Sequence, residues 1–363
     1  MPCRYSRGVR TKRPKSTNGG SDSPISIHAV ADAAGVSIAT VSRVMNAKHM
    51  VSAKTAERVL KVIQETGYVP NPFAHGLSKR ETRVLGITLP DIHGEFYSEL
   101  LRGANAQAHA LGYHLLISSS VAHSATSQNV SAFRRGIAAG LVDGIAIMLT
   151  EPDEDIVQML AKSNIPVVAI DFVLHEKGID SVVVDNTPGT AQAVEHLLSS
   201  VAPDRLYFVG GPADNFDTKE RAETFKTTLA RVGHRMKSGQ ASYGTYTLQW
   251  GQQWARSACK SALLKGAGVL AGNDEIACGI MQAAEDAGLK VPQDLRIVGF
   301  DDTRMSALVR PRLSTVHVPM SDVGSGAIRA LVKRLENRDA KASITLLPTR
   351  LIIRESSSLH SDQ

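Results

Sequence analysis

The feature that most restricts the fold of this 363-residue chain is a regular alternation of short apolar runs and longer amphipathic stretches, which begins at Val84. Such runs are typical of parallel strands buried on both faces, and the intervening stretches have the length and periodicity of helices. The predicted strands are Val84–Leu89, His114–Ser118, Gly144–Leu149, Pro166–Asp171, Ser181–Val184, Leu206–Gly210, Val269–Ala271 and Arg296–Gly299. The expected fold class is therefore α/β, with two doubly wound lobes whose ligands bind beyond the carboxyl ends of the strands. The sequence has no G-x-G-x-x-G motif or P-loop, which argues against a nucleotide phosphate as the ligand.

The segment Val36–Asn46 has a different character and reads as a short helix with Ser37 as its N-cap. At about 100° per residue, its apolar and polar side chains fall on opposite faces. The apolar face carries Val41, Val44 and Met45, and the other face carries Ile38, Ala39, Ser42 and Arg43. A helix with one buried face and one small, hydrogen-bonding face predicts the recognition helix of a helix-turn-helix.

Neighbouring signals complete a small helical domain over residues 25–70. A helix is expected over Ile25–Ala33, Gly35 allows the turn, and a third helix begins at Ser52 and stops at Gly67. Residues 1–24 read as a disordered basic arm. Residues 71–82 are either a linker poised between coil and helix or an ordinary Pro-containing spacer. The two-lobed domain is expected over residues 83–354, followed by a tail at 355–363.

The basic residues are concentrated at the amino-terminal end. Residues 1–80 contain 13 Lys and Arg against 4 Asp and Glu, whereas the remainder contains 28 against 31. This division favours a polyanionic partner for the amino-terminal part alone, although the basic residues before Ser16 could equally be a solubilising tail.

Other features argue against several classes of protein. The three cysteines have neither disulfide nor metal spacing, and no apolar run approaches the roughly 20 residues of a membrane span. The basic amino terminus lacks the apolar region of a secretory signal. We therefore expect a cytoplasmic protein without a membrane partner, a metal or a cofactor.

Several separated motifs together resemble the lactose-repressor (LacI/GalR) family of bacterial transcription regulators, over roughly residues 25–354. The helix-turn-helix signature is carried by Val30-Ala31, Ala34-Gly35-Val36-Ser37, Thr40-Val41-Ser42-Arg43-Val44 and Asn46. The body adds Pro90-Asp91, Phe96-Tyr97, Asp143-Gly144, Ala271-Gly272-Asn273-Asp274 and Val298-Gly299-Phe300-Asp301-Asp302. The body alone would equally resemble periplasmic sugar-binding proteins.

The resemblance implies a homodimer whose two helix-turn-helix domains read a pseudo-palindromic operator in double-stranded DNA. By position, Ile38, Ala39, Ser42 and Arg43 would face the bases, and Arg43 can form a bidentate contact with guanine. Thr40 and Asn46 match positions that face the DNA backbone, and Leu77 matches a leucine wedged into the minor groove.

A sugar site needs carboxylates and amides for hydroxyl pairs, an arginine, and aromatic faces. The candidate effector-binding residues are Phe96, Asp171, Asn215, Asp217, Arg221, Tyr246, Asn273 and Asp301. Arg221, Tyr246, Asn273 and Asp301 match family positions, and Asp171, Asn215 and Asp217 follow predicted strands. Simpler roles remain open: Arg221 could lie on a helix surface, Phe96 could be core, and Asp301 or Asp302 could cap a helix.

The function expected from these features is a ligand-responsive regulator, most simply a repressor of carbohydrate-utilisation genes whose effector is a sugar or sugar acid. The alternative is a sugar-binding protein of a transport system that shares the two-lobed fold. An enzyme acting on glycosides through Asp171, Asp217 and Asp301 is disfavoured, because the sequence has no nucleophile signature or metal spacing, and no catalytic residue is expected.

Overall fold

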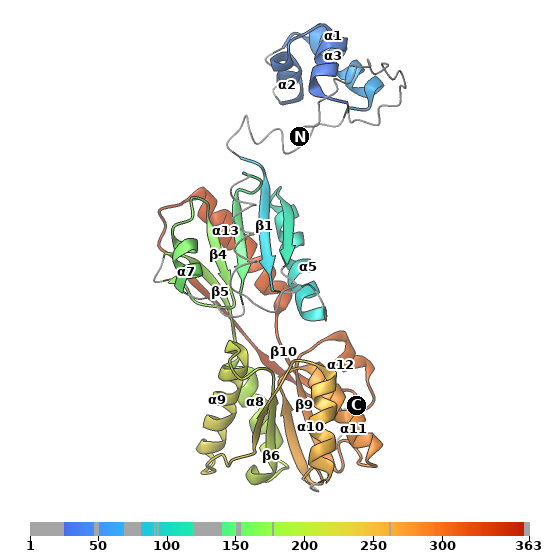
Figure 1. Ribbon diagram of the computed structural model, residues 1–363, viewed down its shortest axis with the longest axis vertical. Coiled ribbons are helices and arrows are strands. Elements are labelled where there is room, and N and C mark those ends of the chain that lie inside the picture. Colours follow the sequence, from blue (N-terminus) through green and yellow to red (C-terminus); the bar gives the residue numbers. More distant parts are fainter. Residues whose placement is uncertain are drawn as a thin grey trace, which may run out of the picture. The chain divides into compact units, whose positions relative to one another are not determined.

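Figure 1 shows the computed structural model of the chain. It describes residues 25–46, 51–68, 81–90, 92, 94–119, 140–149, 154–175, 178–260 and 263–358. The chain divides into two compact units, residues 1–78 and residues 79–363, which we call the amino-terminal unit and the body and describe separately. The expected basic arm (residues 1–24), Leu77 and the expected hinge segment up to residue 80 lie outside the described residues.

The described part of the amino-terminal unit forms the helices α1 (Ile27–Ala34), α2 (Ile38–Asn46) and α3 (Ala53–Thr66). Ser26 caps α1 by accepting a hydrogen bond from the backbone N–H of Ala29 at 3.3 Å, and Ser52 caps α3 in the same way. Gly35 has φ +61°, a conformation that lets the chain turn from α1 into α2. The three helices bury a small core of Val30, Ala31, Ala34, Val41, Val44 and Val59.

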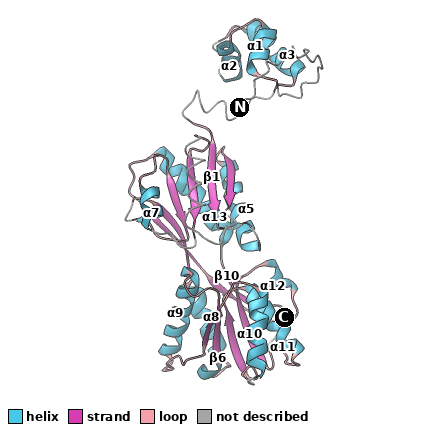
Figure 2. Ribbon diagram, in the orientation of Figure 1, coloured by secondary structure: helices cyan, strands magenta, loops and turns pink. Residues whose placement is uncertain are grey.

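The described residues of the body form two six-stranded sheets, drawn in magenta in Figure 2, which define lobe 1 and lobe 2. Lobe 1 has the strand order β11-β5-β4-β3-β1-β2, and all of its neighbouring strands are parallel. Its strands are β1 (Val84–Leu89), β2 (His114–Ser119), β3 (Gly144–Met148), β4 (Val167–Ile170), β5 (Asp180–Asp185) and β11 (Ile344–Pro348). Its described helices are α5 (Gly94–Ala110), α7 (Glu154–Ala161) and α13 (Met320–Glu336).

Lobe 2 has the strand order β12-β10-β9-β8-β6-β7, and β12 is antiparallel to β10. Its strands are β6 (Leu206–Gly210), β7 (Ala241–Tyr243), β8 (Ala267–Ala271), β9 (Leu295–Asp301), β10 (Ser314–His317) and β12 (Arg350–Ile352). Its helices are η3 (Pro203–Arg205), α8 (Thr187–Leu198), α9 (Phe216–Arg231), α10 (Leu248–Lys260), α11 (Asp274–Asp286) and α12 (Arg304–Leu308). Every run predicted as a strand forms one, but β7, β10, β11 and β12 were not predicted. The sequence also predicted β2 as a strand buried on both faces, and this is wrong, because β2 is an edge strand that is largely exposed.

The chain passes between the lobes three times. The crossover segments are residues 185–187 between β5 and α8, residues 317–320 between β10 and α13, and residues 348–350 between β11 and β12. Thr349 joins the first and third of these segments, since its backbone N–H and its hydroxyl both donate to the carbonyl of Asp185, at 3.2 and 2.8 Å. The Thr349 hydroxyl also accepts from the backbone N–H of Gly189 at 3.1 Å. The first and third crossovers are therefore joined by hydrogen bonds.

Two close contacts between helices α5 and α13 fix the position of α5, whose first turn includes Phe96. A Cβ atom on Gly103 of α5 would lie 1.9 Å from the carbonyl oxygen of Ser321, and one on Gly324 of α13 would lie 2.0 Å from that of Leu100. The two helices approach so closely that only glycine fits at these positions.

The ends of the body differ from the predicted boundaries. Thr82, which the sequence placed in the linker, donates through its backbone N–H and its hydroxyl to Asp143 of lobe 1, at 2.6 and 2.9 Å. At the other end, Ser356 and Ser357 were expected in a free tail but are buried in lobe 2. The Ser356 hydroxyl donates to the carbonyl of Ile297 at 2.6 Å, which fixes the chain against β9. None of the described helices is long and apolar enough to cross a membrane.

Candidate functional site

In the amino-terminal unit, helix α2 has the two faces that the sequence predicts. Val41 and Val44 are fully buried, whereas Ile38, Ala39 and Arg43 are exposed. Ser37 caps the helix by accepting from the backbone N–H of Thr40 at 3.2 Å.

The polar residues on α2 differ in how exposed they are and in what they contact. The Thr40 hydroxyl lies 2.9 Å from that of Ser37, so part of its hydrogen-bonding capacity serves the cap. Ser42 is half-buried beside the exposed Arg43. The side chain of Asn46 lies outside the described residues, as Leu77 does.

In the body, Arg221 is the centre of the candidate effector site. It lies on α9 and is 97% buried, with 3% relative exposure. Its Nε donates to Oδ1 of Asn186 at 2.9 Å, and one terminal nitrogen donates to the carbonyl of Gly272 at 2.7 Å. The other terminal nitrogen lies 3.9 Å from a carboxylate oxygen of Asp217, and the guanidinium stacks 3.7 Å from the ring centroid of Phe300. Its donors are therefore directed at protein groups.

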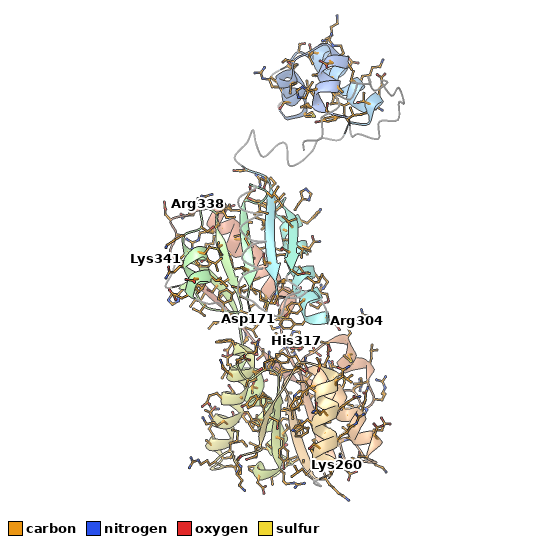
Figure 3. The ribbon with its side chains drawn as sticks, in the orientation of Figure 1. Asp171, Lys260, Arg304, His317, Arg338 and Lys341 are labelled. Carbon is orange, nitrogen blue, oxygen red and sulfur yellow. The ribbon has the colours of Figure 1, made fainter. Side chains whose placement is uncertain are left out.

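Three carboxyl groups surround this guanidinium. Asp171 follows β4 in lobe 1, where Figure 3 shows it between the lobes, and its carboxyl group interacts electrostatically with that of Asp217 in lobe 2. Burial, reinforced by the negative charge of Asp217, raises the pKa of Asp171 well above its usual value. Burial also raises the pKa of Asp301 at the end of β9, and the nearby charge of Arg221 opposes this increase. We call Asp171, Asn186, Asp217, Arg221 and Asp301 the interlobe cluster.

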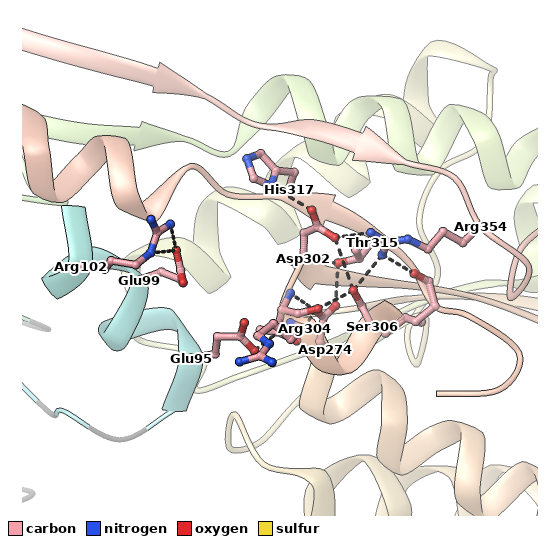
Figure 4. Close-up of polar contacts among 12 residues, drawn as sticks. Glu95, Glu99, Arg102, Asp274, Asp302, Arg304, Ser306, Thr315, His317 and Arg354 are labelled. Atoms are coloured by element: carbon pink, nitrogen blue, oxygen red, sulfur yellow. Dashed lines mark hydrogen bonds and ion pairs between the residues drawn. The ribbon is translucent and has the colours of Figure 1, made fainter. Parts of the chain in front are cut away.

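Asp301 and its neighbour Asp302 have different roles. The Asp302 carboxylate is bound within lobe 2, where it accepts from Arg354 at 2.6 Å and from Nδ1 of His317 at 3.0 Å (Figure 4). No hydrogen bond to the Asp301 carboxylate is found within the described part of the chain. Of this pair, Asp301 is the carboxylate that remains available to a ligand.

Tyr246, Asn215 and Asn273 lie beside the cluster, but each also has a structural role. Oδ1 of Asn215 caps α9 and accepts from the Tyr246 hydroxyl at 3.1 Å, and Oδ1 of Asn273 caps α11. Burial raises the pKa of Tyr246 to about 12. Its ring packs over Gly211, where a Cβ atom would lie 2.5 Å from a ring carbon.

Phe96, the aromatic candidate of lobe 1, packs against the buried core of the body. It is half-buried near the start of α5 and meets Tyr97 edge-on, with ring centroids 5.2 Å apart. The preceding residue, Glu95, accepts a hydrogen bond at 2.8 Å from the backbone N–H of Arg304, which joins lobe 1 to lobe 2 (Figure 4). Among the described residues we find no hydrogen bond or ring contact between Phe96 and the interlobe cluster.

Comparison with known proteins identifies the family. A model of the lacI family of bacterial regulatory proteins matches residues 26–71, and a model of a periplasmic binding protein-like domain matches residues 194–357. The chain is 33% identical over 332 residues to catabolite control protein A of Priestia megaterium, and the alignment covers 92% of this chain and 99% of that protein. The chain belongs to the LacI family.

Solved structures agree with this assignment. The LacI-family chain described here is similar to the lac repressor dimer bound to operator and the anti-inducer ONPF, with a TM-score of 0.81 and 26% identity over 92% of this chain and 99% of that one. It also matches the complex of the transcriptional regulator CelR with cellobiose, with a TM-score of 0.69 and 26% identity over 92% and 100% of the two chains. The predicted family and fold class are confirmed. The prediction of a transcriptional regulator is confirmed as well, because these relatives are regulators that match over nearly their whole length.

Two residues of this LacI-family site were missed by the sequence analysis. Asn186 is fully buried and contacts three charged residues of the site, but in the sequence it reads as an ordinary cap between a strand and a helix. The signal that could have found it is its place two residues after the predicted strand Ser181–Val184. Phe300 directly follows the predicted strand Arg296–Gly299 and lies in a quoted family motif, but its apolar side chain was not considered as a contact of Arg221.

Two cavities in the described part of the body lie away from the interlobe cluster. A cavity of about 540 Å³ lies on lobe 2, between Met281, Leu289 and Val309, and one of about 220 Å³ lies on lobe 1, beside Arg329 and Lys341. Neither includes a residue of the interlobe cluster. Across the described residues, no group of His, Cys, Asp or Glu side chains is arranged to hold a metal ion.

Proposed function

We propose that this protein is an effector-controlled repressor that binds a pseudo-palindromic operator as a homodimer in the bacterial cytoplasm, and that it has no enzymatic activity. The observation that carries the proposal is the similarity, over nearly its whole length, to the lac repressor dimer bound to operator and an anti-inducer. The domain division that goes with it is a basic arm at residues 1–24, a DNA-binding domain at residues 25–70, a hinge from residue 71 and an effector-binding and dimerisation domain that includes Thr82, which is bound to Asp143.

The DNA-binding surface in this proposal is the exposed face of α2. Ile38 and Ala39 would make apolar contacts with thymine methyl groups, and Arg43 would hydrogen-bond to a guanine. Thr40 and Ser42 would add polar contacts, and Asn46 and Leu77 would bind the backbone and the minor groove. Because two of the exposed side chains are apolar, Arg43 would supply most of the hydrogen bonding to base edges.

The effector in this proposal is an uncharged sugar rather than a sugar acid. Asp171, Asp217 and Asp301 surround Arg221, whose donors are already directed at protein groups. A carboxylate on the ligand would meet carboxyl groups whose raised pKa values already reflect the cost of charge at this place, and the donors of Arg221 are already directed at Asn186 and Gly272. Sugar hydroxyl groups can instead donate to the available carboxylate oxygens, with Tyr246, Asn215 and Asn273 beside them and Phe96 as a more distant aromatic face.

The DNA-binding part is tested by mobility shifts with duplexes from upstream of the gene for this protein and its neighbours. We expect specific binding that weakens steeply as salt is raised. Arg43→Ala should lose about 1–3 kcal/mol of binding free energy for the specific duplex, the value of one good base contact. The matched control is Lys61→Ala, which removes an exposed charge of the same sign from α3. Equal losses in the two variants would exclude Arg43 as a base-reading residue, and the absence of specific binding would reject the repressor proposal.

The effector part is tested by thermal unfolding in the presence of D-glucose, cellobiose and D-glucuronate. A sugar that binds only the native state raises the melting temperature, by mass action. We expect a shift with an uncharged sugar and a smaller shift, or none, with D-glucuronate. A larger shift with the acid than with both uncharged sugars would contradict the charge argument.

A further inference from the structure

Asn186 lies where the first crossover between the lobes meets the interlobe cluster. Its side chain is fully buried, and all of its amide atoms have partners. Nδ2 donates to Asp217 at 2.8 Å and to Glu220 at 2.7 Å, while Oδ1 accepts from Nε of Arg221 at 2.9 Å. One uncharged side chain thus contacts two carboxylates and one guanidinium.

These partners fix the orientation of the amide. The two hydrogens of Nδ2 face carboxylates, and Oδ1 faces a guanidinium N–H. Rotating the amide of Asn186 by 180° would place its oxygen against Asp217 and Glu220 and its NH₂ against Arg221, so every one of these contacts would become repulsive. The amide therefore holds the first two turns of α9 in one position relative to the crossover.

The backbone around Asn186 continues this connection into the hinge. Its carbonyl accepts from the hydroxyl and the backbone N–H of Thr190 on α8, at 2.7 and 3.1 Å. The carbonyl of the preceding residue, Asp185, accepts both hydrogen bonds from Thr349 in the third crossover. A displacement of Arg221 or Asp217 is thus transmitted through one side chain to two of the three segments that join the lobes.

We propose that Asn186 is a positioning residue that orients Arg221 and Asp217 for the effector and connects their position to the crossovers, so that occupancy of the site changes the relation between the lobes. The inference rests on the proposed function, because it assumes that the effector binds at Arg221. If Asn186 only stabilised the fold, its amide would need hydrogen-bond partners of any kind. Its replacement would then have no specific effect on hydrogen exchange in α9 or in the third crossover.

The first experiment uses no ligand and follows amide hydrogen exchange by mass spectrometry in the full chain. We expect Asn186→Ala and Asn186→Asp to accelerate exchange in the first turns of α9 and around Thr349 by about tenfold or more, the effect of losing a hydrogen bond to a charged group. Asn186→Asp keeps the shape of the side chain but removes its donors, so it separates this effect from that of a cavity.

The matched control is Thr190→Val, which removes a hydrogen bond to the carbonyl of Asn186 and touches none of the charged residues. Its effect should be confined to α8 and the adjoining crossover. Unchanged exchange in α9 of both Asn186 variants would overturn the proposal. The same pattern in Thr190→Val would also overturn it, because it would show general loosening of the lobe.

The second experiment measures release of the protein from operator by an equimolar mixture of D-glucose and cellobiose. For Asn186→Ala the concentration that gives half-release should rise about tenfold or more, as expected when a coupling free energy of this size is lost. Thr190→Val keeps the backbone hydrogen bond to the carbonyl of Asn186 and should shift this concentration much less than Asn186→Ala does. Release of Asn186→Ala at the wild-type concentration would overturn the coupling. A wild-type protein that binds operator but ignores both sugars would count against the effector class, and the exchange experiment would still decide the role of Asn186.

Discussion

Asp274 provides a quantitative test of how the structure holds charge beside the candidate site. This first residue of α11 is 99% buried, with 1% relative exposure. Its carboxylate accepts from the Thr315 hydroxyl at 2.6 Å, and from the backbone N–H and the hydroxyl of Thr303, both at 2.8 Å (Figure 4). Burial nevertheless raises the pKa of Asp274 from 3.8 to about 7, because these hydrogen bonds only partly replace hydration.

The sign of the pH dependence follows from this increase. Between pH 3.8 and about pH 7 the native protein holds a proton on Asp274 that the unfolded chain has lost. The free energy of unfolding therefore falls as the pH rises through this window. A change in pKa from 3.8 to about 7 corresponds to about 4 kcal/mol, which is present below pH 3.8 and lost by pH 8.

Replacing Asp274 by asparagine removes this loss. The amide cannot ionise, its oxygen can accept from Thr303, and its NH₂ can donate to the Thr315 hydroxyl. Relative to wild type, the free energy of unfolding of Asp274→Asn should therefore rise by about 2–3 kcal/mol between pH 5 and pH 8, the part of the ionisation cost that falls in this interval.

Urea denaturation followed by tryptophan fluorescence is suited to this measurement. Both tryptophans of the chain, Trp250 and Trp254, lie on α10 of lobe 2, which packs against α11. The control is Asp286→Asn at the exposed end of α11, which should leave the pH dependence of wild type unchanged. If wild type and Asp274→Asn lose stability in parallel between pH 5 and pH 8, the assigned burial cost is wrong.

Two further substitutions test other parts of the structure. Arg221→Ala leaves the surrounding carboxyl groups without their cation, so the free energy of unfolding measured by urea titration should fall by about 3–5 kcal/mol. The sugar-dependent rise in melting temperature should disappear, while operator binding persists. A normal response to sugar would refute the assignment of the site. Gly103→Ala places a Cβ atom 1.9 Å from the carbonyl of Ser321, so α5 and α13 must separate at a cost of about 1–3 kcal/mol. Asn105→Ala on the exposed face of α5 is its control, and equal stability of the two variants would contradict the close packing.

The elements that the sequence predicted are those whose pattern is local. The strands with continuous apolar runs, such as Val84–Leu89 and Leu206–Gly210, were found because both of their faces are buried. The strand Arg350–Ile352 has three residues, and Ile344–Pro348 is largely exposed at the edge of lobe 1. Neither has a periodicity that separates it from a loop. Their pairing, which makes the third crossover, depends on contacts with strands more than 30 residues away.

The residues of the candidate site likewise divide into those that the sequence located and those that only the fold reveals. The rule that ligands bind beyond strand ends located Asp171 and Asp217, and the family resemblance located Asp301; in the structure all three carboxyl groups act on the charge of Arg221. The rule applies equally to Asn186, but an asparagine before Thr-Pro also fits a helix cap. Only the fold shows that its amide points to α9 instead, because its partners lie 31–35 residues away in the sequence.

The arrangement of the interlobe cluster ties ligand binding to the position of the lobes. Asp171 belongs to lobe 1, Asp217 and Arg221 belong to lobe 2, and Asn186 lies on a segment that joins them. Asp301 accepts no hydrogen bond among the described residues, but Asn186 bonds to both Asp217 and Arg221. An effector that bonds to Asp217 or Arg221 must therefore replace a contact that reaches a crossover. Such a ligand necessarily has different affinities for different lobe arrangements, and this difference is the condition for shifting a conformational equilibrium. An effector that bound only to Phe96 and the surface of α5 would contact one lobe and could not produce that shift.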